Sequence, residues 1–390
     1  MDAKDYSILY RDNLLDNVIP FWLKHSGDYQ NGGYFTCLDT YGNVYDTDKF
    51  MWLQCRQIWC FSMLFNHVEK KQEWLDFAIH GANFVLKHGR DAEGNWYFSL
   101  DKAGNPLVQP YNIFSDCFAT MAFGQLYLAT KNEQYAEVAR KTFYSIISRS
   151  DNPKGIFSKS FPGTRPLQSF SLPMILCNLV IEIETLLPEK IFRQTIANGV
   201  DTVMNKFYQP DLGLIIENIA TDGTRSDSFE GRVINPGHGI EAMWFIMDLA
   251  EKQNIPGLID KAVDITLSTL EYSWDKKHEG IFYFLDIKGC PPQQLEWDQK
   301  LWWVHVETLI SLAKGYLHTG DQRCREWFEK VHAYTWRCFV DEKNGEWFGY
   351  LNRTGEVLLP LKGGKWKGCF HVPRGLYQLW KTMDKISAKK

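Results

Sequence analysis

Six short stretches of the chain share one pattern of hydrophobic and polar residues. Each begins at a glycine, continues with aromatic or aliphatic residues in alternation, and often ends in a D-x-x-G or N-x-x-G sequence. This pattern is typical of a short β-hairpin, because alternate side chains face one side of a strand and Asp, Asn and Gly favour tight turns. The stretches are GGYFTCLDTYGN from Gly32, GNWYFSLDKAGN from Gly94, GIFSKSFPGT from Gly155, GLIIENIATDG from Gly213, GIFYFLDIKG from Gly280 and GEWFGYLNRTG from Gly345.

The spacing of these stretches indicates an internal repeat. Counted from Gly33, successive anchors are separated by 61, 61, 58, 67 and 65 residues. Between them lie segments such as AMWFIMDLAEKQN and ETLISLAKGYLHTGD, with apolar residues at the i, i+3, i+4 and i+7 positions of helices and enough length for two helices per unit. Six units of a helix pair and a hairpin predict an (α/α)6 barrel, mostly helical, with the hairpins at one rim. We expect residues 1–390 to form a single domain, since each unit packs on its neighbours.

Composition narrows the class of protein. The chain has 390 residues, 45% of them hydrophobic and 23% charged, and a net charge of −4, which favours a soluble protein without the basic surface that nucleic acid or an anionic membrane requires. Its nine cysteines include no CxxC pair, which predicts reduced thiols and a cytoplasmic location. The acidic N-terminal sequence does not resemble a signal peptide, and no apolar run is long enough to span a membrane.

Residues able to do chemistry recur at one position of the repeat. Each follows its glycine anchor by 22 to 27 residues, where the inner helix of a unit is expected to begin. In a ring of helix pairs, residues at the same repeat position lie at one rim of the barrel and face its axis. Because polar groups that face inward need partners or water, we expect these side chains to line one pocket. These residues are Arg56, Asp116, Asn178, His238, His305, Glu307 and His371.

Two histidines have an informative local sequence. In NPGHGIEAMWF, Asn235 is a suitable N-cap and Pro236 a suitable first helical residue, which puts His238 in the first turn and Glu241 on the same face. We expect the helix dipole to keep His238 neutral near pH 7. His371 directly precedes a second predicted helix start, Val-Pro.

Two histidines across a pocket favour inversion of a stereocentre beside a carbonyl. One imidazole removes a proton and the other returns one to the opposite face, while Arg56 holds the enolate oxygen and Glu241 and Glu307 orient hydroxyls or bases. With a single base, an aldose–ketose isomerase is the alternative. A glycosidase would use two carboxylates among Asp116, Glu241 and Glu307, and leaves both histidines without a role. No His or Cys spacing typical of a zinc site is present, so we expect no metal.

Three stretches, RVINPGHGIEAMWF, LWWVHVETLISL and GGKWKGCFHVPRG, resemble the N-acylglucosamine 2-epimerase family, especially its cyanobacterial members. The resemblance runs through nearly the whole chain and implies an (α/α)6 barrel. It implies reversible interconversion of N-acetylglucosamine and N-acetylmannosamine, the step that feeds sialic acid synthesis. The matching positions imply a catalytic set of Arg56, His238, Glu307 and His371. The resemblance further implies a homodimer and activation by ATP, which the reaction does not consume.

Other positions and activities follow with less support from the sequence. The basic loop RSDNPKGIFSKSFPGTR supplies Lys154, Lys159 and Arg165 as candidates for the nucleotide. We expect Tyr111 and Trp302 to contact the sugar, together with Glu241, Asn178 and Asp116. Cellobiose 2-epimerase and a mannose or sulfosugar isomerase are sister activities on the same barrel. A non-catalytic alternative is a partner protein that binds renin, since animal relatives have also been described as renin-binding proteins.

Overall fold

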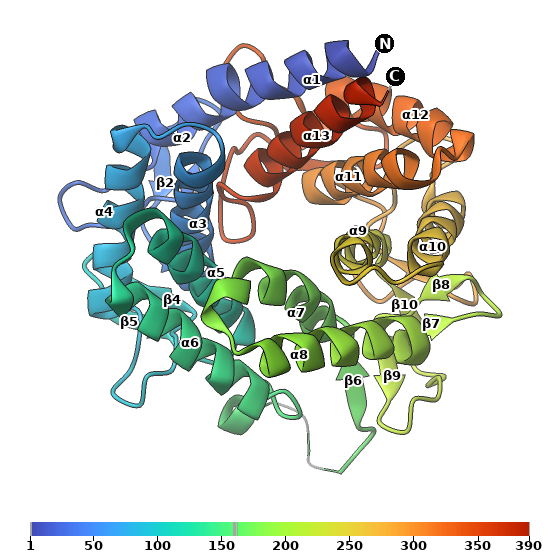
Figure 1. Ribbon diagram of the computed structural model, residues 1–390, viewed down its shortest axis with the longest axis horizontal. Coiled ribbons are helices and arrows are strands. Elements are labelled where there is room, and N and C mark those ends of the chain that lie inside the picture. The colour runs from blue at the N-terminus through green and yellow to red at the C-terminus, as the bar shows by residue number, and fades with distance from the viewer. Residues whose placement is uncertain (1, 159–160, 162, 390) are drawn as a thin grey trace.

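The helices form two concentric layers around one axis (Figure 1). The computed structural model describes residues 2–158, 161 and 163–389. Within this part of the chain, six helices make up the inner layer, each packed against the next. They are α3 (Met51–His67), α5 (Ile113–Thr130), α7 (Ser171–Glu182), α9 (Pro236–Gln253), α11 (Trp302–Thr319) and α13 (His371–Ala388).

The outer layer places one helical segment behind each inner helix. The N-terminal segment packs on α13, so the two ends of the chain lie side by side and close the ring (Figure 1). The predicted (α/α)6 barrel is confirmed. The outer segments are α1 (Ala3–Asp12) with η1 (Asn13–Val18) and α2 (Ile19–His25), then α4 (Gln72–His88), α6 (Glu133–Ser148), α8 (Glu189–Asp201) with η4 (Thr202–Phe207), α10 (Leu258–Ser273) and α12 (Gln322–Phe339).

The two layers differ in how apolar residues are distributed. In α12 the buried Cys324, Phe328, Val331 and Thr335 recur every three or four residues and form one stripe, as expected for a helix with one solvent face. The inner helix α5 is buried around its whole circumference over its first fourteen residues except Phe114, because it packs on neighbours and on the barrel interior. Sequence periodicity therefore distinguishes the outer helices from the inner ones.

Short antiparallel strands lie mainly at the rim where the inner helices begin. β3 (Lys49–Phe50) runs directly into α3, and β12 (Lys300–Leu301) runs directly into α11. The remaining strands are β1 (Cys37–Leu38), β2 (Val44–Asp46), β4 (Ser99–Leu100), β5 (Pro106–Val108), β6 (Leu167–Ser169), β7 (Tyr208–Gln209), β8 (Leu214–Ile215), β9 (Asn218–Ala220), β10 (Val233–Ile234), β11 (Leu285–Asp286), β13 (Tyr350–Leu351) and β14 (Val357–Leu359).

The predicted hairpins are confirmed in the first, second and sixth units, where β1 pairs with β2, β4 with β5 and β13 with β14. In the fourth and fifth units the prediction is wrong, because β8 pairs with β7, β9 with β6 and β11 with β10. The β6–β9 and β10–β11 ladders join neighbouring units. In the third unit, Gly155–Phe157 form a short 3-10 helix and Ile156 is 91% exposed, while the predicted hairpin also includes residues 159, 160 and 162, which lie outside the described part of the chain.

An ion pair between a basic and an acidic side chain precedes four of the inner helices. Lys49, Arg232 and Lys300 lie two to four residues before their helices, whereas Lys362 lies nine residues before α13, and each acidic partner lies in a turn or strand. These pairs anchor the segments that lead into α3, α9, α11 and α13. They are Lys49–Asp28 at 2.7 Å, Arg232–Asp286 at 2.9 Å, Lys300–Asp275 at 3.2 Å and Lys362–Asp341 at 2.8 Å.

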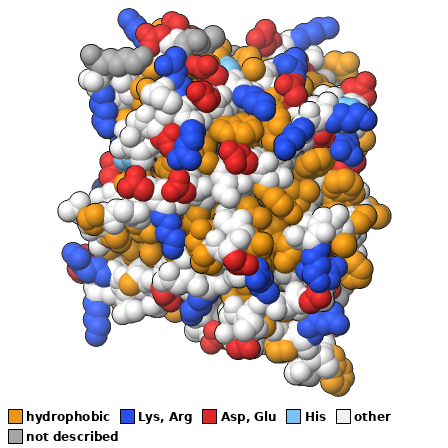
Figure 2. All heavy atoms as spheres, turned by 90° about the vertical axis from the view of Figure 1, so that its right-hand side faces the viewer, with side chains coloured by type: hydrophobic (Ala, Val, Ile, Leu, Met, Phe, Trp, Pro, Cys, Tyr) orange, Lys and Arg blue, Asp and Glu red, His pale blue; other side chains and the backbone are white. Residues whose placement is uncertain are grey.

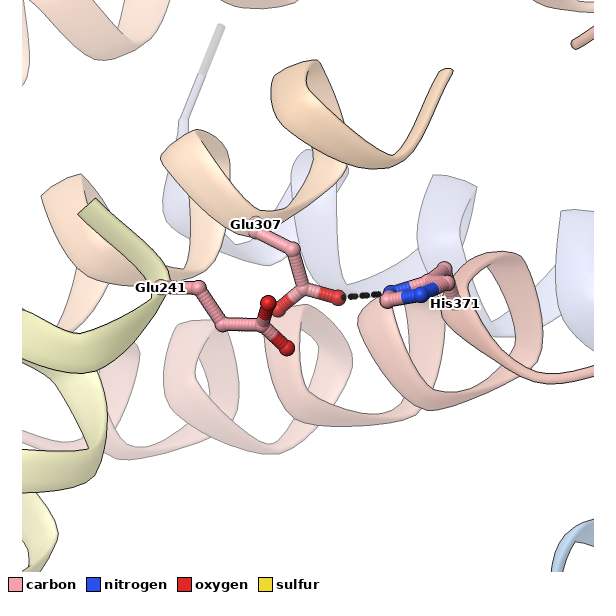
Figure 3. A group of neighbouring side chains, drawn as sticks. All are labelled: Glu241, Glu307 and His371. Atoms are coloured by element: carbon pink, nitrogen blue, oxygen red, sulfur yellow. Dashed lines mark hydrogen bonds and ion pairs between the residues drawn. The ribbon is translucent and has the colours of Figure 1, made fainter. Parts of the chain in front are cut away.

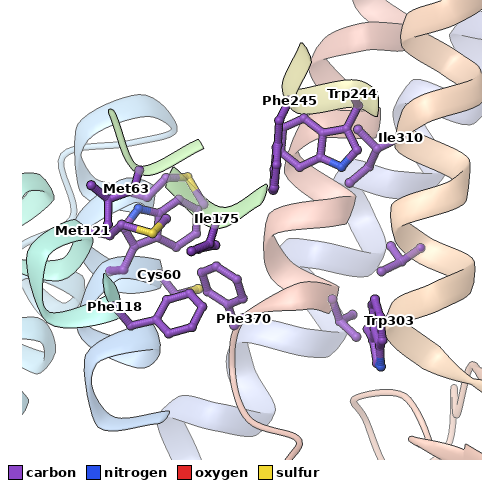
Figure 4. Packing of buried hydrophobic residues seen from close by; sticks show 14 of the residues in the cluster. Cys60, Met63, Phe118, Met121, Ile175, Trp244, Phe245, Trp303, Ile310 and Phe370 are labelled. Atoms are coloured by element: carbon purple, nitrogen blue, oxygen red, sulfur yellow. The ribbon is translucent and has the colours of Figure 1, made fainter. Parts of the chain in front are cut away.

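The interior of the ring is filled by side chains. Figure 4 shows Met63 of α3, Phe118 and Met121 of α5, Ile175 of α7 and Phe370, which directly precedes α13, among the side chains of this core. Lys and Arg are interspersed with Asp and Glu on the face shown in Figure 2. Every helix in the described part of the chain is too short or too polar to cross a lipid bilayer.

Candidate active site

Three buried side chains from three inner helices meet near the barrel axis. Glu241 comes from α9, Glu307 from α11 and His371 from the first residue of α13 (Figure 3). Their ligand atoms all lie within 4.8 Å of one another. The Nδ1 atom of His371 is hydrogen-bonded to Oε1 of Glu307 at 2.7 Å.

Arg374 connects the two carboxylates. Its Nη2 atom donates to Oε1 of Glu307 at 2.6 Å and also to Oε1 of Glu241. Glu307 accepts a further hydrogen bond from Nε1 of Trp244 at 2.9 Å. A metal cation at this spacing would compete with the guanidinium of Arg374, which is already hydrogen-bonded to both acids. Because both carboxylates are hydrogen-bonded to Arg374, Glu241 and Glu307 are not placed on either side of a space that could hold a glycosidic bond. This arrangement argues against the glycosidase alternative.

The charges in this cluster shift one another's protonation. Burial, and after it the charge of Arg56, lowers the pKa of His371 well below its usual value. Burial raises the pKa of Glu307 although the charge and hydrogen bond of Arg374 oppose the shift. Since its Nδ1 is engaged by Glu307, a neutral His371 presents Nε2 as a free base.

Arg56 lies against three aromatic rings. Its guanidinium carbon is 4.4 Å from the ring centroid of Trp52, 3.9 Å from that of Phe118 and 4.7 Å from that of Phe370. Burial and the charge of Arg374 lower the pKa of Arg56 to about 9. Its Nε atom is buried without a hydrogen-bond partner among the described residues, which costs about 1–3 kcal/mol unless a bound molecule supplies an acceptor.

His238 lies in the first turn of α9, as predicted, with Asn235 capping the helix through the His238 amide at 3.2 Å. Its Nδ1 atom lies 3.0 Å and 3.2 Å from the two carboxylate oxygens of Glu217. Burial lowers the pKa of His238, but the charges of Glu217 and Glu241 and the hydrogen bond of Glu217 outweigh burial and raise it. The pKa shift is opposite in direction to the one expected from the helix dipole, because a full carboxylate charge at hydrogen-bond distance exceeds the partial charge of a helix end.

Trp303 joins the two histidines. Its ring centroid lies 5.3 Å from that of His238 and 5.7 Å from that of His371. The two imidazoles thus contact one indole from separate helices and carry opposite pKa shifts.

His305 shares the repeat position of the site residues but has a structural role. Its Nδ1 is bonded to the carbonyl of Leu301 at 2.7 Å, and its Nε2 accepts from the amide of Ile281 at 3.1 Å. Both ring nitrogens are occupied by backbone groups.

Asp116 is paired away from this cluster. Its carboxylate bonds Arg149, at the end of the outer helix α6, and burial raises the pKa of Asp116 to about 6. The structure therefore does not support the expected sugar contact, because the side chain faces the outer layer.

The remaining predicted contacts occupy varied positions. Asn178 Oδ1 and Trp302 Nε1 are buried without partners in the described part of the chain, so both remain available to a polar ligand. The ring centroid of Trp302 lies 6.3 Å from that of His371, and the ring centroid of Tyr111 lies 5.1 Å from that of Phe98. Lys154 and Arg165 are exposed on the loop before α7, where Arg165 lies 3.7 Å from Glu230, and Lys159 lies outside the described residues.

Sequence reasoning missed three residues of this site: Glu217, Trp303 and Arg374. Arg374 stands three positions after His371 in CFHVPR, a spacing that places both on one face of a helix. Trp303 is one of two adjacent tryptophans, of which Trp302 was selected. Glu217 follows a strand rather than an inner helix, so the repeat position carries no signal for it.

Two imidazoles with opposite pKa shifts, a partly unpaired arginine and two buried carboxylates on an (α/α)6 barrel define an acid–base isomerase. The family model for N-acylglucosamine 2-epimerase (GlcNAc 2-epimerase) matches residues 33–372. The chain belongs to this family and is an epimerase.

Known proteins agree with this assignment. The chain is 38% identical to the N-acylglucosamine 2-epimerase of Mus musculus, covering 93% of this chain and 88% of the relative. It is 38% identical to that of Bos taurus, covering 96% and 90%. The solved cellobiose 2-epimerase from Bacillus thermoamylovorans B4167 has the same fold, with a TM-score of 0.85, 20% identity and coverage of 97% and 99%.

Proposed function

We propose that this epimerase interconverts N-acetylglucosamine and N-acetylmannosamine with two histidines, one of which removes the C2 proton while the other adds a proton to the opposite face. The observation that carries the proposal is the pair His238 and His371, which contact one indole and have opposite pKa shifts. The 38% identity to mammalian N-acylglucosamine 2-epimerases supports the substrate.

The reaction begins with the open-chain aldehyde. A neutral imidazole takes the C2 proton, and the C–H electron pair forms the C1–C2 double bond while charge moves to O1. Arg56, with its unpaired Nε, holds the resulting enolate oxygen. The other imidazole, which already carries a proton, then delivers that proton to the opposite face of C2, which restores the aldehyde with inverted configuration, while the first imidazole keeps the proton it removed.

The carboxylates keep the bases oriented. Glu307 binds Nδ1 of His371 and is itself held by Arg374 and Trp244, so the Nε2 lone pair has a fixed direction. Glu241, held by Arg374, places a second negative charge near both histidines. Because this acid–base set is complete, it argues against the non-catalytic, renin-binding alternative.

The sister activities remain defined alternatives. A cellobiose 2-epimerase would act on β-1,4 disaccharides, and an aldose–ketose isomerase would release a ketose. The structural likeness to a cellobiose 2-epimerase, at 20% identity, supports the fold alone.

Turnover in D2O tests the mechanism directly. Wild-type protein should place deuterium at C2 of newly formed N-acetylmannosamine, detected by NMR, because the returned proton comes from a base that exchanges with solvent. Product free of deuterium would contradict the two-base mechanism. His238→Asn and His371→Asn should each abolish epimerisation.

We further propose that the protein is a cytoplasmic homodimer of amino-sugar metabolism that acts without a metal, feeds sialic acid synthesis and is activated by ATP. The free cysteines favour a reducing compartment. Lys154 and Arg165 are exposed cations suited to phosphate groups, and no chemical step above involves the nucleotide. Sedimentation velocity and rates measured with and without ATP test the dimer and the activation.

A further inference from the structure

Glu217 is fixed at the rim of the barrel by its backbone. It lies between β8 and β9, where its amide donates to the carbonyl of Val233 at 3.0 Å and its carbonyl accepts from the amide of Phe170 at 2.9 Å. These bonds tie the residue to the strand before α9 and to the residue before α7. The carboxylate therefore projects from an anchored segment.

The side chain of Glu217 is aimed at one atom of His238. Both carboxylate oxygens lie within 3.2 Å of Nδ1, and the glutamate side chain is 13% exposed. Ser171 donates from Oγ to Oε1 of Glu217 at 3.3 Å. Because an ionised carboxylate only accepts hydrogen bonds, Nδ1 must carry the hydrogen and Nε2 points away from Glu217.

The groups around His238 come from several segments. Glu217 faces Nδ1, Glu241 lies on the same helix, and His371 is close enough for the charge of His238 to lower the pKa of His371. Trp303 of α11 covers the ring without a charge, and Tyr283 lies near both Glu217 and Trp303. Of the carboxylates in this set, Glu217 alone is hydrogen-bonded to His238.

The matching carboxylate of His371 is differently engaged. Glu307 shares its charge with Arg374 and accepts from Trp244, while no cation is bonded to Glu217 among the described residues. In both pairs a glutamate carboxylate is hydrogen-bonded to Nδ1 of a histidine, but only the carboxylate of Glu307 is also paired with an arginine.

We propose that Glu217 is a positioning residue that fixes the Nδ1–H form of His238 and keeps this histidine as the proton-carrying member of the pair in the free enzyme. The inference rests on the proposed function and assigns His371 as the unprotonated member. Substrate whose C2 proton faces His371 then meets a base on one side and an acid on the other.

The test compares Glu217→Gln with wild type. Glutamine keeps the size and an accepting oxygen but removes the charge. In 15N-histidine NMR titrations of the free protein, His238 of wild type should show the Nδ1–H form and titrate at higher pH than in the variant. The kcat of Glu217→Gln should fall about 10- to 100-fold with KM nearly unchanged, a loss of the size seen when the carboxylate partner of a metal-binding imidazole is removed.

The pH profile separates positioning from simple support of the fold. The alkaline limb of kcat, which reports loss of the proton on His238, should move to lower pH in Glu217→Gln, and Glu217→Asp should restore part of the shift. Glu189→Gln, an equivalent change at an exposed ion pair on α8, should alter neither. Unchanged titration of His238, or a slower variant with an unmoved limb, would overturn the proposal. Since the titration needs no substrate, a wild-type protein without epimerase activity would count against the proposed function alone.

Discussion

The guanidinium of Arg374 donates a 2.6 Å hydrogen bond to the carboxylate of Glu307, and both side chains are withdrawn from solvent. The same Nη2 atom also donates to Glu241, so one guanidinium is hydrogen-bonded to both buried carboxylates. The position of His371 depends on this contact, because Glu307 holds its Nδ1.

Replacing Arg374 with Met should therefore destabilise the protein by about 3–5 kcal/mol, since two buried carboxylates lose their cation. Urea unfolding measures the change, and epimerase activity should be lost as well. Arg337→Met removes an exposed partner of Glu279 and should cost at most about 1 kcal/mol. Equal costs for the two variants would contradict the buried role.

Arg56→Lys tests the enolate-binding role. Lysine keeps the charge but loses the planar group that lies against Trp52, Phe118 and Phe370, and with it the directed Nε donor. We expect kcat to fall about 100- to 1000-fold, as for loss of an oxyanion donor, with little change in unfolding midpoint. A variant that retains wild-type kcat would remove Arg56 from the mechanism.

Asp116→Asn should leave catalysis nearly intact. The carboxylate bonds Arg149 rather than the central cluster, so KM for the sugar should change less than about threefold. Stability should change little, because burial already disfavours the charged form of Asp116. Steady-state kinetics checks this expectation. A large rise in KM would indicate that Asp116 contacts the sugar after all.

Stability should fall in acid because of His305. Burial lowers its pKa to about 3 in the folded protein, whereas the unfolded chain titrates near 6.5, so the unfolded state binds more protons between these values. Its contribution is complete above about pH 6.5 and is lost as pH falls toward about 3, by an amount on the order of a few kcal/mol. Urea midpoints at several pH values follow the loss, and His305→Gln should flatten the curve.

The sequence repeat predicted at which end of the inner helices the site lies, but not the direction in which each side chain points. Arg56, His238, Glu307 and His371 were selected by position, and the structure brings them into one electrostatic cluster. His305 and Glu307 both lie at that end of α11, yet two positions on a helix differ by about 200°. One therefore faces backbone groups and the other the axis.

Other features depend on contacts that are distant along the chain. Glu217 reaches His238 from a strand-flanking segment, and β10 finds its partner β11 beyond the next helix pair. Neither pairing has a periodic signal. The outer helices were predictable because solvent on one face imposes the period of a helix on their sequence.

The ion pairs before α3, α9, α11 and α13 precede the four helices that carry Arg56, His238, Glu307 and His371. These pairs lie on the segments by which the chain enters the four helices and are distinct from the cluster of Glu241, Glu307 and His371. A change at one of them would therefore act on the reacting groups through the position of a helix start and not through contact with the sugar.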